Sequence, residues 1–404
     1  MNASTRAAER ERCAHAFLLP DALGRLPPKL LRRYAESYMT IRVGLVAPTM
    51  DILGGHAVQA ERMLEAWRGD RDIEMRLLPI NPPPGRATAR LSRIRFVRTL
   101  LTQLRYWPLL VREVPLVDAV HVFCPSNSSF YLSALPAILV ARLYDKPVVA
   151  NHRGDSAGVL ASSAVVRRLL TSTAINVAPS SYARDITREV GISARVIPNL
   201  CDLNRFQYRV RDPIRPRLIS TRNFEPIYNV ACTLRAFAIV QARFADASLV
   251  VVGAGSTKPA LLALTRDLGL RNVTFVGAVP NLEIARLYDS ADIYVQTPIV
   301  DNMPGSIVEA FAGGLPVVAT DVGGVPAILA HGVHGLLSPS NDHDAVAANV
   351  FAMLDRPSDA RRMAAAAFAT CERYTWSAVG EQWRDVYQSA TGMTLSSVLP
   401  NDDT

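Results

Sequence analysis

The block from Asp301 to Glu309 (DNMPGSIVE) holds the residues whose types and spacing best suit chemistry. Pro304 and Gly305 are typical of the start of a helix, where the first backbone N–H groups have no partner within the helix. Such free amides and the helix dipole attract phosphate oxygens, and the Glu309 carboxylate one turn further along suits a ribose diol. Alternatively, Asp301 is an ordinary turn residue and Glu309 an ordinary surface residue of a helix. That interpretation does not explain the GGLP turn and the apolar VVAT strand that follow. We therefore predict a nucleotide-phosphate site here.

Arg222 offers a cation for the same kind of ligand. It lies just past a short apolar run, RLIS, that predicts a strand. A guanidinium can hold two phosphate oxygens at once and stays charged at any relevant pH. Taken in isolation, a solvated loop arginine is the simpler interpretation.

Two further candidates lie in the first half of the chain. Gly54 and Gly55 lead into a predicted helix, where glycines let backbone amides approach a ligand, although a tight turn without ligand fits the same residues. His152, in the segment NHRGD, follows an apolar strand and would face the ligand-binding edge of a parallel sheet. There it could bind a sugar hydroxyl or relay a proton, whereas a purely structural histidine is the alternative.

Three other apparent motifs are better explained without a bound metal or dinucleotide. The acids of Asp342-His343-Asp344 open a helix, where they cap amides, and His331 and His334 are too few for a zinc site. Gly253-Ala254-Gly255 lacks the third glycine of a dinucleotide site. We predict neither a bound metal nor a cofactor.

The elements that must position these residues form two alternating series. Strand-like runs alternate with helical stretches from residue 41 to about 198 and again from residue 217, which predicts two parallel sheets wrapped by helices. An irregular, Arg- and Pro-containing segment separates the series. The expected parts are an N-terminal extension (1–38), two Rossmann-like α/β domains (39–205 and 206–375) with an interdomain cleft, and a returning C-terminal helix plus tail (376–404).

Composition agrees with a folded, two-domain chain. The 404 residues are 49% hydrophobic and 20% charged, and five scattered cysteines suggest reduced thiols. Neither a signal peptide nor a membrane-spanning run is evident, so we expect a cytoplasmic protein. The net charge of +8 favours an anionic partner: a phosphorylated donor, an acidic membrane surface or nucleic acid.

A basic stretch in the first domain bears on which of these anionic partners the chain binds. Seven arginines occur without an intervening acid, interleaved with aromatic residues, and residues 98, 105 and 112 would share a helix face although Pro108 interrupts it. This pattern suits an acidic membrane surface, and a solvated helix fits it equally well. Nucleic acid is less favoured because no reader motif accompanies it. The seven are Arg86, Arg90, Arg93, Arg95, Arg98, Arg105 and Arg112.

Together these motifs resemble glycosyltransferase family four, a group of retaining enzymes with the two-domain GT-B fold. The resemblance runs from about residue 41 to 390 and is strongest over Asp301–Pro326. Its other parts are Gly54-Gly55, PVVANHRG, APSSYARD, IPNLCD, Arg222, VTFVGAVPN and GLPVVATDVGGVPAIL.

The resemblance implies transfer of a sugar from a nucleotide diphosphate donor (UDP- or GDP-linked), without a metal, to a glycan or lipid-linked acceptor in envelope or exopolysaccharide synthesis. His152, Arg222 and Asp301 would be catalytic: His152 would contact the transferred sugar and Arg222 would neutralise the leaving phosphate. The implied donor-binding residues are Gly54, Gly55, Tyr228, Gly277, Val279, Pro304, Gly305, Ser306, Ile307 and Glu309, with the base near Gly277 to Val279.

Three departures set this chain apart. Asp301 stands where glutamate is usual, and Leu200 replaces a common glycine. Tyr228-Asn229 replaces a Lys-Gly pair, which removes one phosphate cation. An epimerase of the same fold, or a sugar-nucleotide-binding protein without transfer activity, therefore stays open as an alternative.

Overall fold

The computed structural model describes residues 40–51, 54–83, 94–125, 128–153, 163–280, 283–393 and 395. The predicted extension 1–38, Arg86, Arg90, Arg93 and Asp155 lie outside the described residues.

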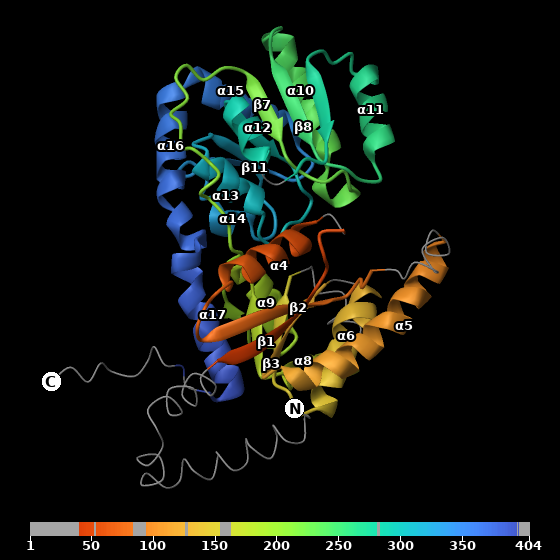
Figure 1. The fold of residues 1–404 in the computed structure, drawn as a ribbon. Coiled ribbons are helices and arrows are strands. Elements are labelled where there is room, and N and C mark those ends of the chain that lie inside the picture. Colours follow the sequence, from red (N-terminus) through yellow and green to blue (C-terminus); the bar gives the residue numbers. More distant parts are fainter. Residues whose placement is uncertain are drawn as a thin grey trace, which may run out of the picture.

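The first domain is built on a parallel six-stranded sheet with the strand order β2-β1-β3-β4-β5-β6 (Figure 1). Alternate residues of β1 enter two different apolar clusters, Val43 and Leu45 on one face of the sheet and Val46 on the other. Both faces are therefore covered, as a parallel sheet requires. The strands are β1 (Ile41–Ala47), β2 (Ile73–Pro79), β3 (Ala119–Cys124), β4 (Val148–His152), β5 (Ile175–Ala178) and β6 (Arg195–Val196).

Among the described residues, five helices accompany this sheet, and one of them differs from expectation. The helix predicted to be interrupted at Pro108 is continuous: α5 runs from Arg95 to Glu113 with Pro108 inside it. Its buried side is anchored by Tyr106 and Leu110, which hold it against the sheet on both sides of the proline. The helices are α4 (Gly55–Ala66), α5, α6 (Ser128–Leu143), α8 (Ala164–Thr171) and α9 (Ser181–Glu189).

The second domain repeats the plan with the strand order β12-β11-β10-β7-β8-β9. Ile293 and Val295 of β10 face one apolar cluster, while Tyr294 between them faces the other. The strands are β7 (Arg217–Ser220), β8 (Ser248–Val252), β9 (Val273–Gly277), β10 (Ile293–Gln296), β11 (Val317–Thr320) and β12 (Leu336–Ser338). The helices are α10 (Val230–Arg243), α11 (Lys258–Asp267), α12 (Ile284–Ser290), α13 (Gly305–Ala312), α14 (Val325–Ile328) and α15 (His343–Asp355).

Two C-terminal helices join the domains. α16 (Pro357–Ala369) lies along the second domain, and α17 (Trp376–Thr391) continues down the side of the first (Figure 1). Val379 and Trp383 of α17 are buried in the same cluster as β1, and Arg384 bonds Asp70 and Asp72 at 2.8 Å each. The last helix thus completes the core of the first domain. None of the described helices is long and apolar enough to span a membrane.

The strand orders locate the places where ligands bind in such sheets. Strand order reverses between β1 and β3 in the first sheet and between β7 and β10 in the second. Loops diverge at such switch points and leave room beyond the carboxyl ends of the strands. Arg222 follows β7, and the Asp301 loop follows β10.

Candidate functional site

The two loops at the switch point of the second sheet meet through an ion pair. Arg222 Nη2 donates to Asp301 Oδ2, and Arg222 Nη1 donates to Ser306 Oγ at 3.2 Å. Both side chains of the ion pair are only 12% exposed. Burial alone would lower the pKa of Arg222, but the Asp301 carboxylate and the nearby tyrosines together outweigh it and the pKa is raised. The guanidinium is therefore charged.

Tyr228 fixes the same guanidinium from its face. The Arg222 Cζ atom lies 4.2 Å from the centre of the Tyr228 ring, within cation–π distance. Tyr228 ends a short 3-10 turn (Pro226–Tyr228), and Asn229 follows with a left-handed φ of 46°. The tyrosine that replaces the expected lysine thus orients the remaining cation.

α13 begins beside this arginine. Its N-cap is Pro304, which makes no side-chain capping bond, and no acid occupies its first turn. The N–H groups of Gly305 and Ser306 therefore have no intrahelical acceptor, whereas Ile307 donates to the Pro304 carbonyl at 3.2 Å. Two free amides and a guanidinium converge near the Ser306 hydroxyl, an arrangement that favours an anion.

Glu309, one turn into α13, has partners in both domains. Its Oε1 atom accepts from Arg62 Nη2 of α4 at 2.9 Å, and its Oε2 atom accepts from the Tyr288 hydroxyl at 3.2 Å. Burial would lower the pKa of Arg62, but Glu309 together with Cys201 and Asp202 outweighs it, so the pKa is raised. We use the name second-domain cluster for Arg222, Tyr228, Asp301, Ser306 and Glu309.

Glycines in two neighbouring loops allow the backbone to approach the cluster closely. A Cβ atom at Gly253 would lie 2.3 Å from the Arg222 carbonyl oxygen, and one at Gly255 equally close to that of Phe224. At Gly323 and Gly324 it would lie 2.3 and 1.8 Å from the carbonyl oxygens of Asp301 and Asn302. No side chain fits at such distances. The GAG and VGG sequences therefore position the Arg222 and Asp301 loops.

Gly277 and Val279 lie at the edge of this arrangement. The Gly277 carbonyl accepts from the Gly253 N–H at 2.9 Å, which ties the end of β9 to the loop that braces Arg222. Gly277 has a φ of +86°, a conformation that other residues rarely adopt. Val279 packs against the apolar cluster that contains Ile307.

In the first domain, Gly54 and Gly55 lie at the start of α4. A Cβ atom at either position would meet no described atom within 4 Å, so packing among the described residues does not require glycine there. His56 follows, and its Nε2 atom lies 3.4 Å from the Arg153 carbonyl oxygen. Arg153 itself stacks on Phe123, with Cζ 4.4 Å from the ring centre.

His152 ends β4 and is buried. Its Nε2 atom lies 2.9 Å from Asn176 Oδ1, and Asn176 Nδ2 donates to the Leu170 carbonyl, which fixes the orientation of the amide. Nε2 must then carry the proton, and Nδ1 keeps a lone pair with no hydrogen-bond partner among the described residues. Burial lowers the pKa of His152, so the ring is neutral. We use the name first-domain cluster for His56, Phe123, His152 and Arg153.

The structure thus brings Arg222, Tyr228, Asp301 and Ser306 into direct contact. Glu309 joins them through Tyr288, whose hydroxyl also lies 3.2 Å from the Ser306 carbonyl oxygen. The described contacts do not connect His152 to them.

Several residues of the site were missed from the sequence. Thr221 Oγ1 lies 2.7 Å from the Tyr288 hydroxyl oxygen. Gln296 Oε1 accepts from the Ser306 and Tyr294 hydroxyls at 3.1 Å each. The missed residues are Arg62, Arg211, Thr221, Tyr288, Tyr294 and Gln296. Tyr294 and Gln296 are two apart on β10, and this polar spacing within a buried strand was the available signal. Arg62 had no such signal because its partner is 247 residues away.

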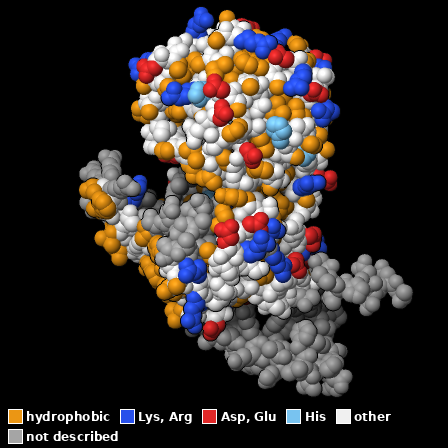
Figure 2. Space-filling model, turned by 180° about the vertical axis from the view of Figure 1, so that it is seen from behind, with side chains coloured by type: hydrophobic (Ala, Val, Ile, Leu, Met, Phe, Trp, Pro, Cys, Tyr) orange, Lys and Arg blue, Asp and Glu red, His pale blue; other side chains and the backbone are white. Residues whose placement is uncertain are grey.

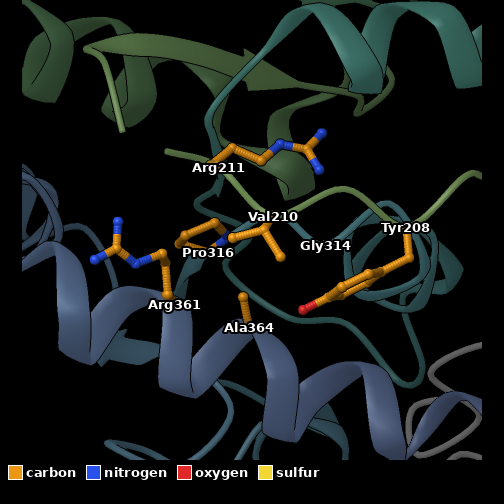
Figure 3. A pocket seen from close by; sticks show the side chains of 7 residues that line it. All are labelled: Tyr208, Val210, Arg211, Gly314, Pro316, Arg361 and Ala364. Atoms are coloured by element: carbon orange, nitrogen blue, oxygen red, sulfur yellow. The ribbon is translucent and has the colours of Figure 1, made fainter. Parts of the chain in front are cut away.

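Arg211 stabilises the ends of two helices that carry site residues. It is buried, and its guanidinium donates to the carbonyl oxygens of Tyr288, Ala291 and Gly313, where α12 and α13 end. Such a cation stabilises helix C-termini. A small pocket, lined by residues of the 208–211 segment, the 314–316 turn and α16, contains none of the predicted site residues, and the Arg211 side chain extends away from α16 there (Figure 3).

The acids and histidines set aside above make local structural contacts. Asp342 caps α15, its Oδ1 accepting from the Ala345 N–H at 2.8 Å. His331 and His334 accept backbone N–H groups in a turn. Cys124, Cys201, Cys232 and Cys371 are free thiols. Within the described part of the chain, no three His, Cys, Asp or Glu side chains are grouped so as to hold a metal ion.

Two tandem parallel α/β sheets, with charged groups at the switch point of the second, define the GT-B fold. Residues 205–370 match the family model described as "Glycosyl transferases group 1". This match covers most of the second domain.

Known proteins resemble the chain over most of its length. A phosphatidyl-myo-inositol mannosyltransferase of Mycolicibacterium smegmatis is 27% identical over 393 residues, which is 90% of this chain and 99% of that protein. A D-inositol 3-phosphate glycosyltransferase of Corynebacterium diphtheriae is 33% identical over 40% of each chain. Anabaena HepE, solved with UDP-glucose, superposes with a TM-score of 0.70 at 18% identity, covering 86% of this chain and all of that one.

Proposed function

We propose that this glycosyltransferase moves a sugar from a UDP- or GDP-linked donor to a glycan or lipid-linked acceptor, with retention of anomeric configuration and without a metal ion. The setting would be envelope or exopolysaccharide synthesis on the cytoplasmic side of a membrane. The relatives named above as mannosyl- and glycosyltransferases of inositol compounds, and the UDP-glucose in the Anabaena structure, support a nucleotide-sugar donor.

One observation carries the proposal: the Arg222 guanidinium lies against the Ser306 hydroxyl at the free N-terminus of α13. A departing diphosphate needs positive potential where its charge develops, and preorganised donors in a poorly solvated site supply it effectively. Arg222 and the amides of Gly305 and Ser306 would fill this role. Pro304 and Ile307 would stabilise the turn at the start of α13. Asp301 would fix the orientation of the Arg222 guanidinium while the guanidinium also binds the diphosphate.

The remaining predicted residues keep the roles that the resemblance implies. Glu309 would bind the ribose, Gly277 and Val279 the base, and Gly54 and Gly55 the space between donor and acceptor. His152 would accept a hydrogen bond from the transferred sugar at Nδ1. In the step itself, the bond from the anomeric carbon to the diphosphate breaks, a bond to the acceptor oxygen forms on the same face, and the acceptor proton passes to the departing phosphate.

A donor panel tests this proposal. UDP-, GDP- and ADP-sugars are screened for protection against thermal unfolding, and the best one is then tested for transfer and for slow donor hydrolysis. We expect one nucleotide class to raise the unfolding temperature, and Arg222→Ala to lose most of the turnover. Absence of protection by every donor would contradict the proposal. Tight binding without transfer or hydrolysis would favour the sugar-nucleotide-binding alternative, and a changed sugar on an intact nucleotide would favour an epimerase.

A surface of the first domain suits a lipid-linked acceptor. The side chains of Phe96, Leu100 and Leu104, four residues apart on α5, are 85%, 60% and 62% exposed. They form one apolar stripe of α5, a helix that carries Arg98 and Arg105 on another face, and hydrophobic side chains line this edge of the domain in Figure 2. Apolar and basic side chains on one helix favour an acidic membrane surface.

Co-sedimentation with vesicles tests this part separately. We expect binding to vesicles that contain anionic lipid, weakened by salt and by Leu100→Glu with Leu104→Glu. Binding that depends on neither anionic lipid nor salt would remove the membrane from the proposal and leave the donor reaction untouched.

A further inference from the structure

Three arginines approach the boundary between the two domains, and they differ in how their charge is balanced. Arg62 is paired with Glu309 and Arg222 with Asp301. Arg153, which directly follows β4, has no carboxylate within ion-pair distance among the described residues. A poorly solvated cation without a counter-charge is costly, and it is therefore a candidate to bind an anion.

The surroundings of Arg153 hold the guanidinium without neutralising it. Nη2 donates to Asn199 Oδ1, the Phe123 ring covers one face, and Nε has no partner within the described residues. All of these contacts are to neutral groups. Burial accordingly lowers the pKa of Arg153 to about 9, with no opposing acid in the described part of the chain.

Arg153 lies between the first turn of α4 and the loop that precedes α13. On one side, its carbonyl oxygen lies 3.4 Å from His56 Nε2, in the first turn of α4 beyond the open positions Gly54 and Gly55. On the other side, Asn199 also donates from Nδ2 to the Met303 carbonyl oxygen at 3.3 Å, two residues before α13 begins. Arg153 is thus one residue removed from the proposed diphosphate loop.

We propose that Arg153 is the centre of an anion site on the acceptor side, which binds a phosphate or similar oxyanion group of the acceptor substrate. Arg153 presents the cation, and its backbone carbonyl contacts His56 in the first turn of α4, whose N-terminus has no side-chain cap. The donor diphosphate has its own cation and amides in the second domain, so the charge of Arg153 is available to a second anion. This inference rests on the proposed transfer function, because that function places an acceptor here.

Calorimetric titration of the full chain tests the site. Inorganic phosphate and glycerol 3-phosphate are titrated into protein saturated with the nucleoside diphosphate that binds best, so that the donor site is occupied. We expect binding by the wild type, a loss of at least tenfold in phosphate affinity for Arg153→Gln, and a smaller loss for Arg153→Lys. The affinity for the nucleoside diphosphate should stay within twofold.

Arg384→Gln is the matched control, since Arg384 also lies against an aromatic ring, Trp67, but binds two aspartates away from the site. It should leave both affinities unchanged. A second measurement needs no variant: phosphate should slow hydrogen exchange at residues 55–58 and 152–153 of the nucleotide-saturated wild type, and not in α13.

Three results would overturn the anion site: no phosphate binding by the wild type, unchanged phosphate affinity in Arg153→Gln, or a tenfold loss of nucleotide affinity in that variant, which would make Arg153 a donor cation. Failure of the proposed function is distinguishable. It would appear as no nucleotide binding by the wild type, and Arg153-dependent phosphate binding would then be measured without nucleotide.

Discussion

The two clusters that flank the domain boundary differ in the state of their polar groups. In the second-domain cluster, each charged side chain has a partner of opposite charge: Arg222 has Asp301, and Glu309 has Arg62 from the other domain. In the first-domain cluster, the histidines His56 and His152 are neutral because burial lowers their pKa values, and the partners of the Arg153 cation that the structure describes are all neutral.

This difference fits what each side would have to recognise. A diphosphate has the same charge and shape whichever sugar it carries, so charged groups can be fixed in advance around its site. An acceptor differs between related enzymes, and its site is formed by loops and lone pairs, such as His152 Nδ1, that a ligand must complete. The following predictions test how far this division holds.

The largest expected effect is on turnover in Arg222 variants. Arg222→Ala removes the cation at the developing diphosphate charge, and we expect a loss of roughly 3 kcal/mol of transition-state stabilisation, a hundredfold or more in kcat. Arg222→Lys keeps the charge but loses the forked contact to Asp301 and Ser306, so it should be intermediate. Steady-state kinetics with saturating donor measures both.

The control is Arg209→Ala, which removes an exposed arginine that pairs with Asp289 away from the site. It should leave kcat near the wild-type value. Unchanged turnover in Arg222→Ala would refute the catalytic role of the second-domain cluster.

The two clusters also differ in how well the sequence predicts them. The alternation of apolar runs predicted both sheets, since strands buried on both faces read as continuous apolar segments such as LVVV of β8. Arg222, Asp301 and Ser306 were predictable because each lies just after a strand or at a helix start. The glycine pair Gly323-Gly324 is visible in the sequence as part of VGG. The reason that glycine is needed there, contact with the Asp301 loop, is seen only in the structure.

What could not be predicted depends on contacts across the chain. The partner of Arg62 is 247 residues away, and Arg211 acts on helix ends 77 to 102 residues away. The continuity of α5 through Pro108 depends likewise on the burial of Tyr106 and Leu110 on either side of the proline. Tertiary packing decided these features, and local sequence patterns carry no record of it.

A double-mutant cycle on Arg62 and Glu309 would sharpen the comparison, because this bridge joins the two domains at the site. Arg62→Met and Glu309→Gln each leave a buried partner without its counter-charge, so each should lower the free energy of unfolding by about 3 kcal/mol. The double variant should lose less than the sum, with a coupling of about 1–3 kcal/mol. Denaturant unfolding measures all four proteins, and additive losses would mean that the bridge does not couple the domains.

The smallest expected effect is an unequal response of the two domains to mild acid. Burial lowers the pKa of His56 to about 4 and that of His121, which bonds Tyr387 of α17, to about 3, and it lowers the pKa of His152 as well. An unfolded histidine titrates near pH 6.5, so between that value and these lower ones the unfolded chain binds more protons than the folded chain. The stability that these neutral rings contribute is therefore complete above pH 6.5 and is lost as the pH falls toward 4 and then 3.

All three histidines lie in the first domain, so acid should loosen that domain first. Hydrogen exchange at pH 7 and pH 5, corrected for intrinsic rates, should show a greater loss of protection in β3 and β4 than in β10 and β11. His121→Gln should reduce the loss, while His331→Gln, in a turn of the second domain, should not. Equal loss in both sheets would indicate that carboxylates spread over the whole chain govern the acid response, and that the neutral histidines do not distinguish the domains.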